Sequence, residues 1–175
     1  MAFQFVFAGF GGQGVLFAGK VTANTGLIDG KQVTWLPSYG PEMRGGTANC
    51  SVCLSEEPIG CPMVMHPDVL VAMNGPSYDR FAETVRPGGL ILADSTLVQC
   101  DEQDHRIRPI PATRLAADNG LEGLANILLL GRMLRLTGFT TYESMKQSIR
   151  NCVPASKAYL LEANFKAFEI GFQYQ

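Results

Sequence analysis

Two glycine-containing segments hold the candidate ligand-binding residues of this chain. Residues 9–14 read Gly-Phe-Gly-Gly-Gln-Gly and match the G-x-G-x-x-G spacing, in which glycines let the backbone approach a phosphate closely. The candidate binding residues here are Gly11, Gly12, Gln13 and Gly14, because exposed amides at the start of a helix favour an anion. A tight strand-to-helix turn without any ligand is the alternative use of the same glycines.

The second segment, residues 38–46, reads Ser-Tyr-Gly-Pro-Glu-Met-Arg-Gly-Gly. Arg44 offers a planar fork of donors that suits phosphate or carboxylate, and Gly45 follows it as the other candidate binding residue. The alternative is a surface loop in which Arg44 pairs with Glu42 or with solvent. Because this loop follows a predicted strand, we expect it at the same carboxyl edge of a sheet as residues 9–14.

The elements that must position these segments are predicted from apolar patterns. A buried strand is expected at 3–8 and a helix at 15–28, so residues 9–14 would join the two. Further strands are predicted at 32–37, 47–54, 68–73 and 90–93, with an edge strand at 105–110 and a helical segment from 74 to about 85. This alternation predicts an α/β fold: a Rossmann-like, doubly wound, largely parallel sheet with helices on both faces.

The last third of the chain is predicted to be helical. Asn119 and Glu122 have the spacing of a capping box at the start of a helix that reaches Leu136, and Thr140 and Glu143 repeat that spacing before a short helix. The 3, 4, 3, 4 spacing of apolar residues after Pro154 predicts a seam that docks on the domain or on another chain, formed by Ala158, Leu161, Phe165, Phe168 and Phe172. We expect residues 1–175 to form a single domain.

The composition excludes several classes of protein. Hydrophobic residues make up 46% of the chain and charged residues 17%, which predicts a globular fold rather than disorder. The 14 Lys and Arg against 16 Asp and Glu give a formal net charge of −2, so we expect no binding to nucleic acid or to a membrane. Five cysteines without an export signal favour free thiols and a cytoplasmic location.

Two nucleotide-binding motifs are incomplete. Dinucleotide binding needs an acidic residue at the end of the second strand, but residues 35–38 read Trp-Leu-Pro-Ser; Asp29 comes too early and Glu42 too late. The G-x-x-x-x-G-K spacing of 14–20 is followed by Val21, where a P-loop requires Ser or Thr for magnesium.

Metal-binding and catalytic patterns are not supported either. Cys50 and Cys53 lie three residues apart in a predicted strand, so their side chains should point to opposite faces. Neither histidine has a nucleophile or a carboxylate at a spacing that would indicate a catalytic triad. We therefore predict no catalytic residue and no metal ligand in this chain, and favour turn and capping roles for Asn74, Asp94 and Ser95.

Taken as a pair, residues 7–14 and 38–46 resemble the gamma subunit of 2-oxoacid:ferredoxin oxidoreductases. The resemblance extends over nearly the whole chain, and the sequences at 9–11 and 38–41 are closer to the 2-oxoglutarate branch than to the pyruvate branch. It implies a multisubunit enzyme that converts a 2-oxoacid, coenzyme A and oxidised ferredoxin into acyl-CoA, carbon dioxide and reduced ferredoxin.

The resemblance also implies how the work is divided among subunits. Thiamine diphosphate and iron–sulfur clusters would belong to partner alpha, beta and ferredoxin-like delta subunits, ferredoxin would accept the electrons, and the isolated chain would be inactive. The gamma role would be structural, with a hypothesised share of the coenzyme A site, because coenzyme A carries phosphates that suit the candidate residues. A stand-alone nucleotide-binding module or small NAD-dependent reductase is the competing interpretation.

Overall fold

The computed structural model describes residues 2–38, 47–101 and 103–175. At its centre is a six-stranded sheet with the order β2-β3-β1-β4-β5-β6. Its strands are β1 (Phe3–Phe10), β2 (Gln32–Ser38), β3 (Thr47–Ser55), β4 (Val69–Ala72), β5 (Leu90–Asp94) and β6 (Ile107–Ile110).

The sheet is largely parallel, as predicted, with one strand reversed. Strands β1, β4, β5 and β6 run parallel to one another, whereas β3 is antiparallel to both β1 and β2. The short connection explains the reversal. Only residues 39–46 separate β2 from β3, and a parallel neighbour needs a crossover of roughly a dozen or more residues.

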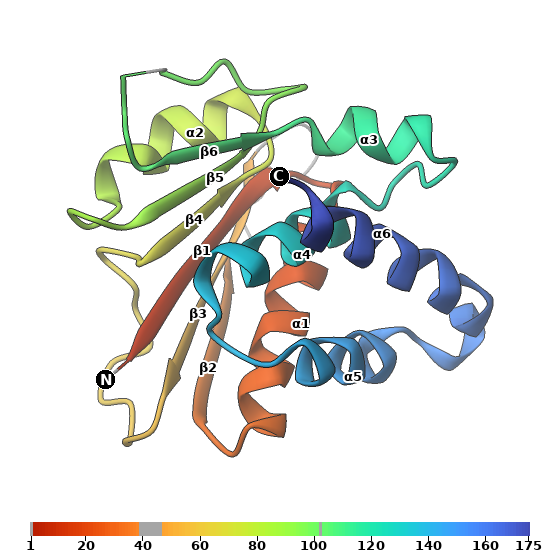
Figure 1. Cartoon of the computed structure of the whole chain (residues 1–175). Coiled ribbons are helices and arrows are strands. Elements are labelled where there is room, and N and C mark those ends of the chain that lie inside the picture. The colour runs from red at the N-terminus through yellow and green to blue at the C-terminus, as the bar shows by residue number, and fades with distance from the viewer. Residues whose placement is uncertain (1, 39–46, 102) are drawn as a thin grey trace.

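Helices cover both faces of the sheet, which confirms the predicted architecture (Figure 1). Helices α1, α4, α5 and α6 lie on one face and α2 lies on the other. The helical segments are α1 (Val15–Ile28), α2 (Gly75–Phe81), α3 (Ala112–Asp118), α4 (Ala125–Thr137), α5 (Tyr142–Cys152) and α6 (Leu161–Gln173), with 3-10 segments η1 (Ala82–Thr84) and η2 (Ala155–Leu160). No helix among the described residues is long and apolar enough to cross a membrane.

Strand β1 supplies side chains to a separate hydrophobic core on each face. Phe5 and Phe7 belong to the larger core beneath α1 and α4, and Val6 and Ala8 belong to the smaller core beneath α2 and η1. All four are buried. A strand buried on both faces has a nearly continuous apolar sequence, which is why residues 3–8 are recognisable as a central strand.

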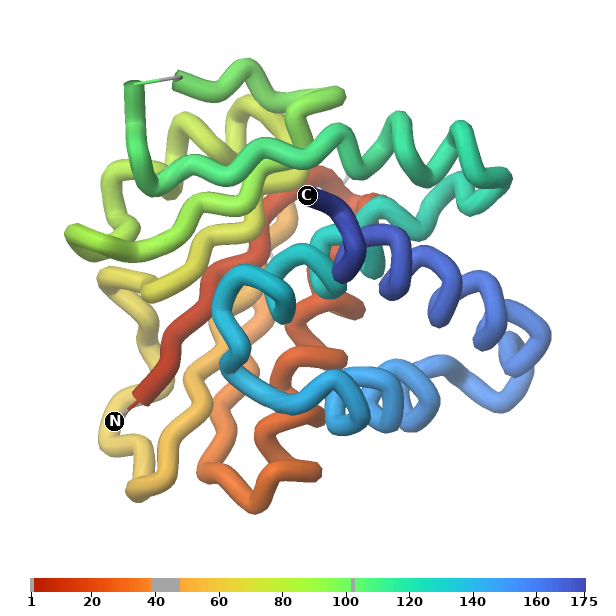
Figure 2. Tube along the Cα trace, in the orientation of Figure 1, coloured from red at the N-terminus to blue at the C-terminus, as the bar shows by residue number. Residues whose placement is uncertain are grey.

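The C-terminal layer is held by a close crossing of α4 and α6, which run side by side in Figure 2. A Cβ atom at Gly131 or Gly171 would overlap backbone of the facing helix, so the two helices touch through their main chains. Phe168 of the predicted seam is fully buried beside this crossing. Leu161, Phe165 and Phe172 are partly buried against the same core and Ala158 is exposed, so most of the seam docks on its own domain.

Two predicted helix starts are wrong. Asn119 does not cap a helix; it directly follows α3, which the pattern did not predict, and α4 begins only at Ala125. Gly120 and Gly123 adopt φ values of +66° and +84°, which interrupt the helix expected across this stretch. Thr141, rather than Thr140, caps α5 by accepting a hydrogen bond from the Ser144 amide.

Candidate functional site

Residues 11–14, named here the glycine loop, join the end of β1 to the start of α1. Gly12 has φ +96° and Gly14 has φ +76°, a region of backbone conformation that favours glycine. Gly14 is the residue that precedes the first turn of α1, and a Cβ there would overlap the side-chain amide of Asn126. The loop geometry therefore requires glycine at position 14 for two separate reasons.

The side chain of Gln13 ties the glycine loop to two strands. Its Oε1 accepts a hydrogen bond of 2.6 Å from the Phe10 amide, and its Nε2 donates one of 2.9 Å to the Met73 carbonyl. The Gln13 backbone amide donates to the Phe10 carbonyl at 3.2 Å. Gln13 was predicted as a binding residue, and these three bonds make it a positioning residue for the loop.

Asn126 is a site residue that the sequence motifs do not reveal. Its Nδ2 donates to the Gly14 carbonyl at 3.2 Å, while its Oδ1 is buried without a partner among the described residues. The two residues are 112 positions apart in the sequence, so no local spacing points to this contact. Asn126 lies in the first turn of α4 and fixes that helix against the start of α1.

The glycine loop leaves backbone donors available to a ligand. Within the part of the chain that the structure describes, the amides of Gly11, Gly12 and Gly14 have no hydrogen-bond partner. These glycines line a depression of about 260 Å³ together with Val15 to Phe17 and Ala48. The first turn of α1 has no acidic side chain, so its positive end is not neutralised locally. This arrangement suits a phosphate.

A second depression lies on the other side of the glycine loop. It has a volume of about 280 Å³ and extends from Gly12 and Gln13 past Met73 and Leu97 to Thr113. Its wall is mostly apolar. A ligand whose phosphate sits at the loop could therefore lay an apolar portion along this surface.

The second predicted loop connects β2 to β3. Residues 39–46, including the candidate residues Arg44 and Gly45, lie outside the described residues. The strand register fixes where this loop begins and ends: Thr47 is paired with Phe10, and Ser38 with Asn49. Both ends therefore lie at the edge of the sheet where β1 enters the glycine loop.

Polar residues at the ends of β4 and β5 have structural partners, as predicted. Asn74 caps α2, because its Oδ1 accepts a hydrogen bond of 2.8 Å from the Ser77 amide. The buried Asp94 carboxylate accepts hydrogen bonds from the amide and hydroxyl of Thr113, which places it at the start of α3. These groups position helices around the site.

The two strand cysteines face opposite sides of the sheet, as their spacing predicts. Cys50 packs against Gly19 of α1, where burial raises the pKa of its thiol to about 12. Cys53 lies on the other face, next to Gln4, and burial also raises its pKa. No group of three or more His, Cys, Asp or Glu side chains in the described ranges could hold a metal ion.

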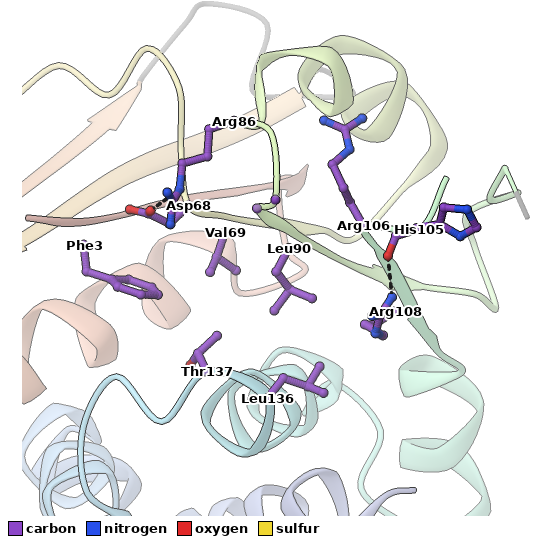
Figure 3. A pocket seen from close by; sticks show the side chains of 12 residues that line it. Phe3, Asp68, Val69, Arg86, Leu90, His105, Arg106, Arg108, Leu136 and Thr137 are labelled. Carbon is purple, nitrogen blue, oxygen red and sulfur yellow. Dashed lines mark hydrogen bonds and ion pairs between the residues drawn. The ribbon is translucent and has the colours of Figure 1, made fainter. Parts of the chain in front are cut away.

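A larger depression of about 620 Å³ lies at the opposite edge of the sheet, where β1, β4 and β5 begin (Figure 3). Arg86 forms an ion pair with Asp68 at its rim, and Arg106 forms one with Asp104. Arg108 points the other way from Arg106, toward Leu136 of α4 (Figure 3). This depression is therefore separate from the glycine loop.

Comparison with known proteins shows the family. The model of the family described as pyruvate ferredoxin/flavodoxin oxidoreductase matches residues 4–174. The chain belongs to this oxidoreductase family. The match includes the glycine loop and the whole sheet, so the resemblance seen in the two glycine-containing segments is confirmed.

Two curated relatives from this oxidoreductase family have different lengths. The chain is 39% identical over 171 residues to the 2-oxoglutarate synthase subunit KorC of Methanocaldococcus jannaschii, covering 95% of this chain and 90% of that protein. It is 42% identical over 169 residues to the ketoisovalerate oxidoreductase subunit VorA of Methanothermobacter thermautotrophicus, covering 95% of this chain. The chain spans about a third of the length of that VorA, 35%.

Solved structures in the same family share the fold. The gamma subunit of a keto/oxoacid ferredoxin oxidoreductase from Geobacter sulfurreducens aligns with a TM-score of 0.86 and 31% identity, covering 99% of this chain and 95% of that one. The 2-oxoglutarate:ferredoxin oxidoreductase from Magnetococcus marinus aligns with a TM-score of 0.85 and 24% identity, covering 97% of this chain and 30% of that one. The second likeness shows the fold alone.

Proposed function

We propose that this chain, acting as one domain over residues 1–175, is the gamma subunit of a multisubunit 2-oxoacid:ferredoxin oxidoreductase. Such an enzyme converts a 2-oxoacid, coenzyme A and oxidised ferredoxin into acyl-CoA, carbon dioxide and reduced ferredoxin. The observation that carries the proposal is the end-to-end likeness to KorC, 39% identity over 95% of this chain and 90% of that subunit. The likeness to a solved gamma subunit over 99% of the chain supports it.

The proposed 2-oxoacid is 2-oxoglutarate. KorC is named for 2-oxoglutarate and matches this chain over nearly its whole length, whereas VorA is named for ketoisovalerate and is about three times longer than the matched part. We assign binding of the 2-oxoacid to the partner subunits. The test below includes both acids and pyruvate.

The electron-transfer and carbon chemistry are assigned to the alpha, beta and delta partner subunits. The sequence has no C-x2-C-x2-C-x3-C run for an iron–sulfur cluster, and its five cysteines are all free thiols. We assign the clusters to those partners on this ground and thiamine diphosphate by the likeness to the family, with ferredoxin as the electron acceptor. Free thiols favour a cytoplasmic location for the complex.

The share of this chain in catalysis is binding part of coenzyme A. The unpartnered amides of Gly11, Gly12 and Gly14 would hold one phosphate group at the positive end of α1. Arg44 and Gly45 belong to a loop whose two ends lie at the same edge, and the guanidinium would pair with a further phosphate. Gln13 keeps the loop in place.

A small NAD-dependent reductase is not supported. Dinucleotide binding uses an acidic side chain at the end of the second strand to hold the ribose, and β2 ends with Leu36, Pro37 and Ser38. The glycine loop then matches the phosphate-binding half of the motif without its ribose-binding half.

The assignment is tested by purifying the tagged chain from its own cells under gentle lysis. We expect thiamine diphosphate and iron to co-purify with it, and the complex to reduce ferredoxin when given coenzyme A and 2-oxoglutarate. Faster reduction with ketoisovalerate or pyruvate would change the substrate assignment alone. Recovery of neither thiamine diphosphate nor iron would contradict the gamma-subunit assignment.

The coenzyme A site is tested on the same complex with Arg44→Ala. The variant loses one charge-assisted hydrogen bond, which contributes roughly 1.5–3 kcal/mol. We therefore expect the dissociation constant for coenzyme A to rise by about tenfold to a hundredfold. Arg114→Ala is the matched control, because Arg114 is an exposed arginine on α3. An unchanged dissociation constant for Arg44→Ala would remove that residue from the site.

A further inference from the structure

Three arginines gather on the helical face of the molecule, away from the glycine loop. Arg132 and Arg135 lie three residues apart on α4 and so share one side of that helix. Arg108 comes from the edge strand β6 and points toward the end of α4 (Figure 3). These three residues are named here the arginine surface.

Two of the positive charges act on the third, that of Arg132. The pKa of Arg132 lies below its ordinary value, first because of burial and then because Arg135 and Arg108 repel its charge, while Tyr174 acts in the opposite direction. Like charges brought together in this way disfavour the folded arrangement unless a negative partner is present.

No carboxylate neutralises the arginine surface within the described part of the chain. Other arginines of the molecule are paired: Arg86 with Asp68 and Arg106 with Asp104. Arg108 instead donates to the carbonyls of two residues that precede it in the chain, His105 and Ile107, at 2.7 and 2.8 Å.

The guanidinium of Arg132 keeps a donor that the domain does not use. Its Nη1 donates to the Tyr174 carbonyl, but its Nε is buried and has no partner among the described residues. A buried charged donor without a partner is costly, so the domain alone does not satisfy the Arg132 guanidinium.

Aromatic rings hold two of these arginines in position. The Arg132 guanidinium lies 5.4 Å from the ring centroid of Tyr174, and that of Arg135 lies 5.7 Å from the ring of Phe172. The two arginines and these rings line a depression of about 560 Å³. Preorganised arginines beside aromatic rings are typical of the energetically dominant centre of protein–protein interfaces.

From this geometry we propose that the arginine surface docks an acidic segment of another subunit of the complex. The proposal rests on the proposed function, because it needs the chain to assemble with partners. Charge complementarity defines the occupant: three guanidiniums that have no carboxylate partner among the described residues match the charge of Asp and Glu side chains. The aromatic rings next to them favour a polypeptide over a small anion.

The first experiment measures how salt dissociates the complex. Arg108→Gln with Arg135→Gln removes two exposed charges, and Arg114→Gln with Arg150→Gln removes two exposed charges elsewhere as the control. At low salt we expect the first pair to weaken assembly by at least about tenfold and to flatten its salt dependence, with the control unchanged. Identical salt titrations for both pairs and the wild type would overturn the proposal.

The second experiment identifies the partner carboxylate. In a complex carrying Arg135→Lys, a carbodiimide joins the new amine directly to any carboxylate in contact with it, and mass spectrometry locates the product. A link to Asp or Glu of another subunit supports the proposal, and links confined to this chain, or none, overturn it. Inorganic phosphate is the competing occupant of the arginine surface. If phosphate raises the melting temperature of the wild type but not that of Arg108→Gln with Arg135→Gln, while assembly stays unchanged, the surface binds a small anion instead.

The two proposals fail in different ways. If the wild-type chain co-purifies with neither thiamine diphosphate nor iron, the gamma-subunit assignment and the docking proposal fall together. If it co-purifies with both and the variants assemble as the wild type does, only the docking proposal falls.

Discussion

The glycine loop and the arginine surface are two different kinds of site for a negatively charged group. The glycine loop presents uncharged backbone amides from neighbouring residues, shaped by Gly12 and Gly14. The arginine surface presents charged side chains from β6 and α4, steadied by aromatic rings near the end of α6. Backbone donors suit close contact with a phosphate, and long side chains suit the carboxylates of another protein.

Helix α4 connects the two regions. Asn126 in its first turn contacts Gly14, and Arg135 lies nine residues later in its last turn. At a rise of about 1.5 Å per residue these contacts are roughly 14 Å apart along the helix axis. The comparison therefore predicts that each region can be damaged without the other, provided that α4 stays in place.

The largest effect is expected where α6 supports the arginine surface. Gly171→Ala places a methyl group against the Leu128 backbone, so α6 must move away from α4, and we expect the free energy of unfolding to fall by about 3 kcal/mol. Urea denaturation measures the change. Gly60→Ala, at a position with open space, should stay within about 0.5 kcal/mol of the wild type. A loss below 1 kcal/mol for Gly171→Ala would show that the helices can separate at little cost.

A smaller loss is expected at the other end of α4. Gly14→Ala combines an unfavourable backbone conformation with overlap at Asn126, so we expect unfolding to become easier by about 2 kcal/mol. Gly30→Ala is the control for backbone conformation alone, because Gly30 has φ +73° and open space around it, and about 1 kcal/mol is expected there. Equal losses for the two variants would mean that Asn126 does not restrict the loop.

The side chain of Gln13 should contribute less. Gln13→Leu leaves the Phe10 amide and the Met73 carbonyl without their partner, and we expect a loss of about 1.5 kcal/mol in chemical denaturation. Gln147→Leu removes an exposed amide on α5 and should change stability by less than about 0.5 kcal/mol. If Gln13→Leu matched that control, the loop would hold its shape through its glycines alone.

The last effect appears only at alkaline pH and concerns Tyr142, in the aromatic packing beneath the arginine surface. Its hydrogen bond to Glu169, followed by burial, raises the pKa of Tyr142 from 10.0 to about 12. Because the folded state favours the neutral phenol, this stabilisation is fully present below pH 10 and is lost as the pH rises from 10 to about 12. Tyr142→Phe should therefore lose less stability than the wild type over that interval. Parallel curves for the two proteins would contradict the shift.

Features encoded in adjacent residues were predictable from the sequence. The helix expected at 15–28 has the bounds observed for α1, and the glycine loop lies between a strand and a helix as its spacing predicts. The central strands were also located from their apolar runs, because a strand that is buried on both faces consists almost entirely of apolar residues. The ends of the loop at 39–46 were placed correctly at the edge of β1.

Features that depend on distant residues were not predictable. The reversed direction of β3 is different, because the short connection that causes it is visible in the sequence although the alternating pattern predicts a largely parallel sheet. The break after α3 depends on the backbone conformations of two glycines, which the capping pattern does not indicate. Asn126 and Met73 contact the glycine loop only once the sheet has formed. The arginine surface is the clearest case, because folding alone brings Arg108 near Arg132.

The Michaelis constant for coenzyme A, measured on assembled complexes carrying either Arg44→Ala or Arg135→Gln, tests the division of roles most directly. The account predicts a constant raised by about tenfold for Arg44→Ala and an unchanged one for Arg135→Gln, whose defect should appear only as weaker assembly. An unchanged constant for Arg44→Ala, or a rise of the same size for both, would contradict a coenzyme A site at the glycine-loop edge that is separate from the arginine surface.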